Sequence, residues 1–305
     1  MTLTEFPTFR RAQASLPFLI AALALALAAA LPLLPPFYIR ACADTLLAAL
    51  IFHGLRAARL PLAHTLAITA LTFAQAGIFL SATGRAGSIW LALAVYCVAQ
   101  AAAGFVQHRD ARRVMVLGAA LSLAQVLDPM GALLAMFLLP VCVGLPRPGE
   151  GREKIGLLAL LLFAPVITAL VLAYARGVLG LDPMAFARAD LDGQPIAHVS
   201  LALLLFAGFA SAPVLWLTMF VANLRRAASL ITVYAALAVL LAIAIACLIG
   251  SERDLATVMA ATAAASAAAL CTWRRLARHA DLALAASALA AVVSWLLFNL
   301  PSVVS

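Results

Sequence analysis

Charged residues are scarce in this 305-residue sequence, where Asp, Glu, Lys and Arg make up 10% of the chain and apolar residues 66%. A soluble domain carries about 25% charged and about 45–50% apolar residues. So many apolar side chains cannot all be buried within one chain of this length, and we expect much of the surface to face lipid. The composition therefore excludes a soluble enzyme, a disordered tail and a disulfide-stapled secreted module.

Paired cysteines and nucleotide-binding or hydrolytic motifs are also absent. The five cysteines form no C-x-x-C pair and lie in or beside apolar runs, so we interpret them as small buried hydrophobic residues. The sequence has no Walker A sequence, G-x-G-x-x-G turn, H-E-x-x-H or G-x-S-x-G. It therefore gives no signal of an ATPase, a Rossmann enzyme, a zinc protease or a hydrolase, and predicts no metal site and no resident cofactor.

Long apolar runs fill the chain instead. A helix needs about 20 apolar residues to cross the hydrocarbon core of a membrane. Eight runs have a suitable length, at 16–35, 62–82, 86–106, 155–175, 200–222, 229–250, 255–273 and 280–300. A ninth run, 41–55, is short and ends before Arg56 and Arg59. We interpret 16–35 as a retained first span, because it is longer than the apolar part of a signal peptide.

Residues 114–145 are apolar but too long for one crossing, and Asp128-Pro129 and Gly131 lie at their middle. Proline lacks an amide donor and disfavours helix at the preceding residue, so a break is expected near Asp128. Two arms of about 14 residues each reach about 21 Å, which is short of a full crossing. The pattern predicts a broken-helix hairpin that enters and leaves on the same side.

The basic residues orient these spans. With the amino terminus inside, fifteen Lys and Arg residues fall on the inner side and five on the outer side, as the positive-inside rule requires. The outer five are Arg40, Arg85, Arg176, Arg188 and Arg253. The net charge of +8 is then explained by orientation and by anionic lipid headgroups, and we expect no nucleic-acid partner.

The predicted fold is therefore an all-α polytopic transmembrane bundle with about nine crossings plus the hairpin at 114–145, N-in and C-out. Residues 1–305 form a single integral membrane domain. We expect a multi-pass protein of the bacterial cytoplasmic (inner) membrane.

Two aspartates, Asp44 and Asp128, are expected at membrane depth, where an ionisable side chain is energetically costly. Asp44 follows the first span with Arg40 one helical turn earlier, which fits either a local ion pair at a helix amino terminus or a functional site. Asp128, at the hairpin tip, either caps the second arm or serves a site. A hairpin reaching the level of Asp44 would gather these carboxylates with outer groups in one outward-facing pocket. Those groups are Arg40, Arg176, Arg188, Asp190, Asp192 and His198.

This layout resembles the GT-C superfamily of polytopic glycosyltransferases over residues 10–180, with additional helices in 200–300. The resemblance rests on an outer aspartate after the first span and on the basic loop Gln107-His108-Arg109-Asp110-Ala111-Arg112-Arg113. That loop precedes the broken apolar segment, and Arg147 to Lys154 form a second basic loop after it.

The resemblance implies transfer of a sugar from a polyprenyl-phosphate donor at the outer face, with Asp44 as the catalytic aspartate. Arg40, Arg176 or Arg188 would neutralise the donor phosphate, and a divalent cation is compatible with this chemistry. No D-x-D pair accompanies Asp44, so a non-catalytic relative fits equally well.

Two other classes of function stay open. A small-molecule or lipid transporter or flippase would place Asp128 and the broken helix beside a substrate path. A structural or assembly subunit of a larger membrane complex would use small-residue helix faces, such as 260–270, to pack against partner subunits.

Overall fold

The computed structural model describes residues 36–83, 89–108, 111–127, 151–180, 252–273 and 275–299. Every regular element within these ranges is a helix, which confirms the all-α class for this part of the chain. In chain order they are α2 (Pro36–Ala57), α3 (Leu62–Ala74), α4 (Ala76–Ala82), α5 (Ile89–His108), α6 (Ala111–Leu127), α8 (Gly151–Gly177), α13 (Glu252–Thr272), the 3-10 helix η2 (Leu276–His279) and α14 (Ala280–Asn299).

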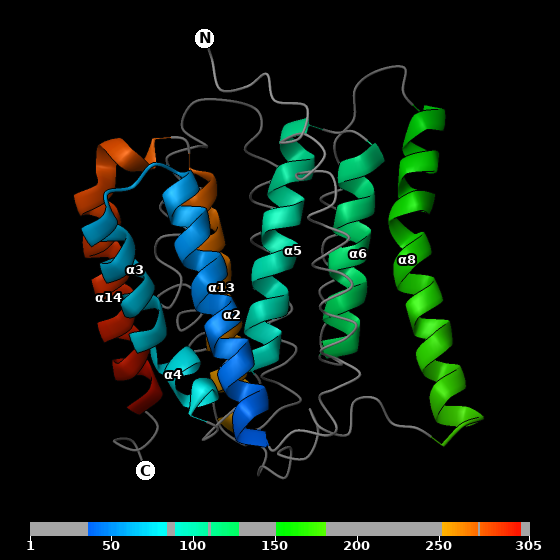
Figure 1. The fold of residues 1–305 in the computed structure, drawn as a ribbon, viewed down its shortest axis with the longest axis horizontal. Coiled ribbons are helices and arrows are strands. Elements are labelled where there is room, and N and C mark those ends of the chain that lie inside the picture. Colours follow the sequence, from blue (N-terminus) through cyan, green and yellow to red (C-terminus); the bar gives the residue numbers. More distant parts are fainter. Residues whose placement is uncertain are drawn as a thin grey trace.

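The long helices lie side by side and run between two ends of the bundle (Figure 1). Helix α13 packs along α5 and also contacts α2 and α4, while α14 packs on α3. Helix α6 lies between α5 and α8, so α8 is the outermost described helix on that side (Figure 1). The core is therefore centred on α2, α5 and α13.

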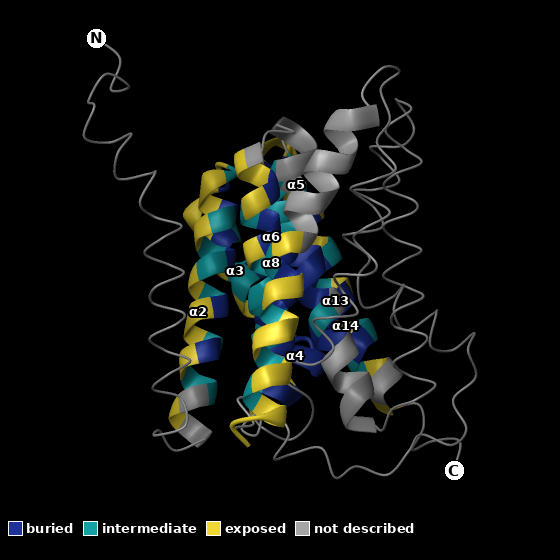
Figure 2. Ribbon diagram, turned by 90° about the vertical axis from the view of Figure 1, so that its right-hand side faces the viewer, coloured by how far each residue is buried: buried dark blue, intermediate teal, exposed yellow. Residues whose placement is uncertain are grey.

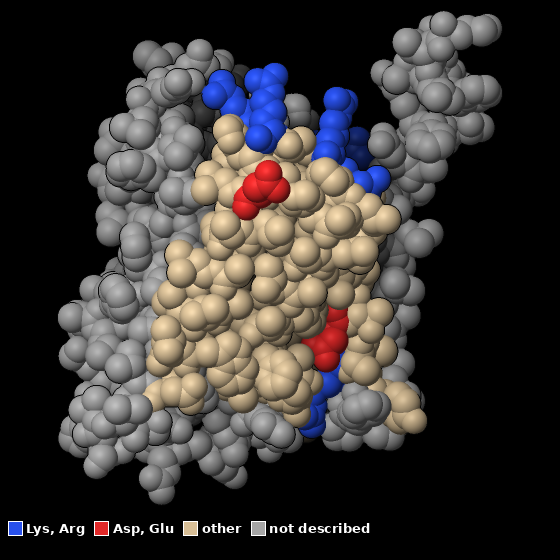
Figure 3. Space-filling view, turned by 90° about the vertical axis from the view of Figure 1, so that its left-hand side faces the viewer, with Lys and Arg blue, Asp and Glu red and all other residues tan. Residues whose placement is uncertain are grey.

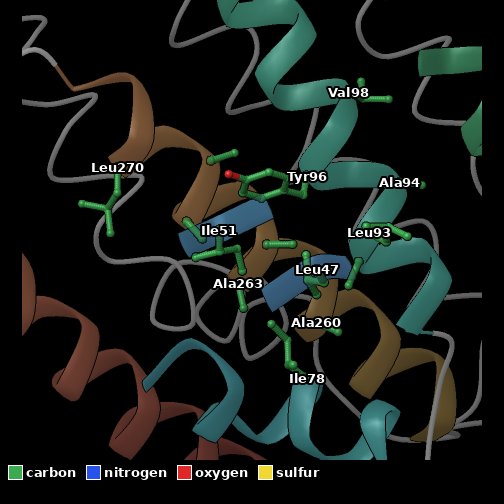
Figure 4. Packing of buried hydrophobic residues seen from close by; sticks show 14 of the residues in the cluster. Leu47, Ile51, Ile78, Leu93, Ala94, Tyr96, Val98, Ala260, Ala263 and Leu270 are labelled. Carbon is green, nitrogen blue, oxygen red and sulfur yellow. The ribbon is translucent and has the colours of Figure 1, made fainter. Parts of the chain in front are cut away.

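The alanine-rich face of α13 explains this close packing. Ala260, Ala263, Ala264, Ala267 and Ala268 are all buried, and small side chains let neighbouring helix backbones approach closely. The close-up of the core shows larger residues of α2, α4 and α5 around this face (Figure 4). They include Leu47, Ile51, Ile78, Leu93 and Tyr96. The small-residue face at 260–270 therefore packs against helices of this same chain, and packing against partner subunits stays a prediction.

Helix α2 begins earlier than the sequence predicts. The short helix expected at 41–55 is part of a 22-residue helix, Pro36–Ala57. Proline is well suited to the first helical position, because its missing amide needs no partner there. Cys42 on this helix is exposed, so the expectation that the cysteines are buried is wrong at this position. A 22-residue helix is about 33 Å long, enough to cross a hydrocarbon core.

The predicted continuous run 62–82 is broken at Gln75, where α3 and α4 meet at an angle of 75°. Gln75 has φ −64° and ψ 137°, an extended conformation that ends α3. The backbone groups freed by the break find partners on α14. Ser294 Oγ accepts a hydrogen bond from the Ala76 amide at 3.0 Å, and Trp295 Nε1 donates to the Ala74 carbonyl at 2.8 Å.

Large apolar side chains remain exposed on the outer helices. Phe163, Leu170 and Tyr174 of α8 are 58–65% exposed, and Leu289 and Leu296 of α14 are 57% and 62% exposed. Figure 2 shows exposed residues along most of the described length of α8. Among the described residues, one segment, 276–296, is long and apolar enough to span a membrane, and the bent pair of α3 and α4 is a second if it counts as one span.

Helices α6 and α8 lie on either side of the predicted break near Asp128 in the sequence. Both helices begin at the same end of the bundle, as a segment that enters and leaves on one side requires (Figure 1). Helix α6 ends at Leu127, directly before the predicted break. Asp128, Pro129 and the second arm lie outside the described residues, as do the runs 16–35, 200–222 and 229–250. The hairpin and the count of nine crossings stay predictions.

Candidate functional site

The described arginines separate into two groups at opposite ends of the bundle. One end, here called the basic end, holds the carboxyl ends of α2 and α13, the amino end of α6, and η2. Its described arginines are Arg56, Arg59, Arg112, Arg113, Arg275 and Arg278. Arg40 and Arg176 lie at the opposite end. Uncharged atoms cover most of the length between the two ends (Figure 3). These groups match the predicted inner and outer sets.

Asp44 is half-buried on α2, toward the end opposite the basic end. Its Oδ1 atom is buried and accepts no hydrogen bond within the described part of the chain. Its neighbours along the helix satisfy themselves, since the Thr45 hydroxyl donates to the Ala41 carbonyl at 2.7 Å. A buried carboxyl oxygen without a partner is costly, so this position is not explained by local structure alone.

The helix-terminus explanation for Asp44 is wrong, whereas an electrostatic attraction between Asp44 and Arg40 is present. Helix α2 starts at Pro36 and has no acidic residue in its first turn, so Asp44 neither caps nor complements the helix amino terminus. No contact within 4.0 Å joins Asp44 to Arg40 in the described structure, but the Arg40 guanidinium is close enough to attract the Asp44 carboxylate. Arg40 lies one turn earlier on the same helix and is half-buried. The functional interpretation of Asp44 stays a prediction.

The other predicted outer residues are only partly described. Arg176 is exposed in the last turn of α8, at the same end as Arg40. Helices α5 and α6 lie between α2 and α8, so the described structure does not bring Arg176 beside Asp44 (Figure 1). The remaining predicted residues, Asp128, Arg188, Asp190, Asp192 and His198, lie outside the described residues. The shared outward-facing pocket stays a prediction.

A cavity of about 490 Å³ opens at the basic end, where the sequence predicted no site. We call it the basic-end cavity. It lies between α2, α5, α6 and α13, and Arg59, Gln100, Arg113 and Trp273 are among its lining residues. The full lining is Ala57, Ala58, Arg59, Gln100, Gly104, Arg113, Cys271, Thr272 and Trp273. Small-molecule sites commonly have volumes of about 300–1,000 Å³.

A polar network ties three helices together beside this cavity. Gln100 Nε2 donates to the Ala268 carbonyl of α13 at 3.2 Å and to Tyr96 Oη at 3.4 Å. Tyr96 Oη donates to the Leu50 carbonyl of α2 at 2.9 Å and lies 3.5 Å from Cys271 Sγ. Gln100 is therefore an interhelical hydrogen-bond partner. The network holds α2, α5 and α13 together. It therefore also holds Gln100 and Cys271 in place where they line the cavity.

Arg59 has a left-handed backbone conformation with φ 65°. It follows α2, and two hydrogen bonds close the turn: Leu60 N to the Leu55 carbonyl at 3.3 Å, and Arg59 N to the Arg56 carbonyl at 2.9 Å. This is a Schellman motif, whose left-handed position is usually glycine. The Arg56 guanidinium donates to the Leu60 carbonyl at 2.6 Å and reinforces the turn.

The site was missed because its residues are far apart in the sequence. Arg59, Arg113 and Trp273 look like ordinary headgroup-level residues at the ends of three separate runs. The signal available was arginine at the end of 41–55 where glycine usually ends a helix, but the left-handed conformation is visible only in the fold. Among the described residues, no cluster of three His, Cys, Asp or Glu side chains is arranged to hold a metal ion.

No known protein family, curated protein or solved structure matches this chain. The arguments below therefore rest on the residues and their geometry.

Proposed function

We propose that this chain is a multi-pass protein of the bacterial inner membrane, with about nine crossings plus the hairpin at 114–145, N-in and C-out. The grouping of arginines at two ends and the exposed apolar side chains between them support this arrangement. The segment 276–296 and the bent α3–α4 pair supply two of the spans.

Within that membrane protein, we propose that Asp44 serves the binding or transfer of a polyprenyl-phosphate-linked sugar at the outer face. One observation carries this proposal: the buried Oδ1 of Asp44 accepts no hydrogen bond among the described residues, and Asp44 has no capping role. A costly buried carboxyl oxygen without a hydrogen-bond partner supports a site for an external ligand. The proposed ligand class, a polyprenyl-phosphate-linked sugar, comes from the resemblance of residues 10–180 to the GT-C layout.

The chemistry needs a base and an anion partner. Asp44 would accept the proton of an acceptor hydroxyl while that oxygen attacks the anomeric carbon of the sugar. The bond from this carbon to the donor phosphate then breaks, and polyprenyl phosphate leaves with the bonding electrons. Arg40, one turn away on α2, would neutralise the charge that develops on the leaving phosphate.

A divalent cation needs more than this residue pair provides. The described part of α2 offers a single carboxylate, Asp44, which by itself does not fit a cation with several oxygen ligands. No step above uses a cation.

The test is Asp44→Asn in the full chain, reconstituted in nanodiscs with polyprenyl-phosphate-linked pentoses and hexoses. Loss of a general base should lower the rate of sugar release by roughly 10²- to 10⁴-fold while folding is retained. Asp281→Asn is the matched control, because Asp281 is 99% exposed and lies at the basic end.

Sugar release that Asp44→Asn leaves unchanged would overturn the catalytic role of Asp44. Wild-type protein that binds lipid-linked sugar without releasing it would identify a non-catalytic relative. Wild-type protein that binds no lipid-linked sugar, and purifies only together with other membrane proteins, would replace the proposal with an assembly subunit.

A further inference from the structure

We propose that the basic-end cavity binds the phosphate group of a phosphorylated organic molecule, with Arg59 and Arg113 as its anion ligands. The cavity lies at the opposite end of the bundle from Asp44, so this inference does not rest on the proposed function. Its volume of about 490 Å³ far exceeds the space of about 30 Å³ that one water takes up in the liquid, and leaves room for an organic part beside the phosphate.

The charge of this end favours an anion. Six described arginines lie here, and the one described carboxylate at this end, Asp281, pairs with His64 at 2.9 Å. A cleft lined by one sign of charge concentrates ligands of the opposite sign. Two guanidinium groups from different helices match the double charge of a phosphate monoester better than the single charge of a carboxylate.

Arg113 of α6 lines the cavity and lies close to Gly104 of α5. A Cβ at Gly104 would lie 3.1 Å from Arg113 Nη1, so the guanidinium of α6 packs directly against the backbone of α5. Gln100 lines the cavity one turn earlier on α5. The helix pair therefore places a cation and an amide on the same wall.

Arg59 is held in a conformation that glycine would adopt without strain. Its left-handed backbone follows from the Schellman turn, which needs no arginine. In the described structure, no carboxylate or carbonyl accepts a hydrogen bond from the Arg59 side chain. Strain kept at a single position of this kind is characteristic of functional sites. Arg59 is exposed and lines the cavity, so its guanidinium is accessible to an external anion.

An aromatic wall completes the cavity. Trp273 lines it and stacks on His279, with ring centroids 5.6 Å apart and the planes within 8° of parallel. This stacking orders the indole, which offers the organic part of a ligand an apolar face beside the arginines.

The experiment uses the full chain and two sources of phosphate. In detergent, the unfolding temperature is measured with inorganic phosphate and with chloride at matched ionic strength. In phosphatidylcholine nanodiscs, it is measured with and without phosphatidic acid. We expect a saturable rise in at least one arm: a rise with inorganic phosphate identifies a soluble ligand, and a rise with phosphatidic acid alone identifies a lipid headgroup.

Three variants locate the site. Arg59→Gly and Arg113→Ala should each raise the apparent dissociation constant at least about tenfold, since each removes charge-assisted hydrogen bonds. Arg112→Ala is the matched control, because Arg112 is exposed next to Arg113 but does not line the cavity. Arg59→Gly should unfold at the same or a higher temperature than wild type without ligand, so its loss of binding cannot be ascribed to misfolding.

Absence of a rise in both arms overturns the proposal. So does a rise that Arg59→Gly and Arg113→Ala leave unchanged, or one that Arg112→Ala lowers equally, because the phosphate then binds elsewhere on the basic end.

Discussion

Gly54 is a position where α2 lies close to two neighbouring helices. A Cβ there would lie 2.6 Å from Cys271 Sγ on α13 and 2.7 Å from Tyr96 Oη on α5. Both atoms belong to the polar network beside the basic-end cavity. The absence of a side chain at this residue therefore allows the three helices to meet.

We expect Gly54→Ala to destabilise the bundle by about 1–3 kcal/mol, because overpacking at such a contact outweighs the gain in helix propensity. The measurement is the thermal unfolding of the purified protein in a mild detergent. Gly177→Ala is the control, since a Cβ at Gly177 would meet nothing within 4 Å. A Gly54→Ala protein as stable as the control would contradict the described packing.

The break between α3 and α4 is a feature of the element scale. It falls at Gln75, whose side-chain oxygen is buried and unpartnered among the described residues. Contacts with α14 hold it: Ser294 accepts from the Ala76 amide, and the rings of Phe79 and Trp295 lie 5.7 Å apart. The bend thus depends on a helix more than 200 residues away in the sequence.

Ser294→Ala should cost about 1–3 kcal/mol of stability, because it leaves the buried Ala76 amide without an acceptor. Ser287→Ala is a matched control on the same helix. Ser287 is equally buried, but its hydroxyl donates to the Ala283 carbonyl of its own helix, so little is lost. Chemical or thermal unfolding in detergent compares the two variants. Equal effects would argue against the hydrogen bond from the Ala76 amide to Ser294 as a stabilising contact of α4.

At the scale of the whole molecule, the distribution of charge is the main organising feature. Arginines lie at the ends of the bundle and apolar side chains are exposed between them, an arrangement suited to a membrane. The predicted orientation puts the basic end in the cytoplasm and Asp44 toward the outside.

Cysteine labelling tests this orientation. In a cysteine-free background, Arg176→Cys should react with a membrane-impermeant maleimide in intact spheroplasts, whereas Arg278→Cys should react only after permeabilisation. Both positions are exposed, so access depends on the side of the membrane alone. Reaction of both from the same side would contradict the topology.

The sequence by itself determined the all-helical class and the sorting of arginines into two sets. Hydropathy and charge act locally along the chain, so apolar runs form helices and arginines stay at their ends whatever the partners. It also identified Asp44 as a candidate and 260–270 as a packing face.

Only the tertiary structure decided the start of α2, the break at Gln75 and the basic-end cavity. The break and the cavity depend on contacts between residues that are far apart in the sequence. Helix α2 extends back to Pro36 and removes the helix-terminus explanation for Asp44. The break at Gln75 needs Ser294 and Trp295 of α14. The basic-end cavity needs Arg59, Arg113 and Trp273 to meet from three helix ends, a meeting that no local pattern encodes.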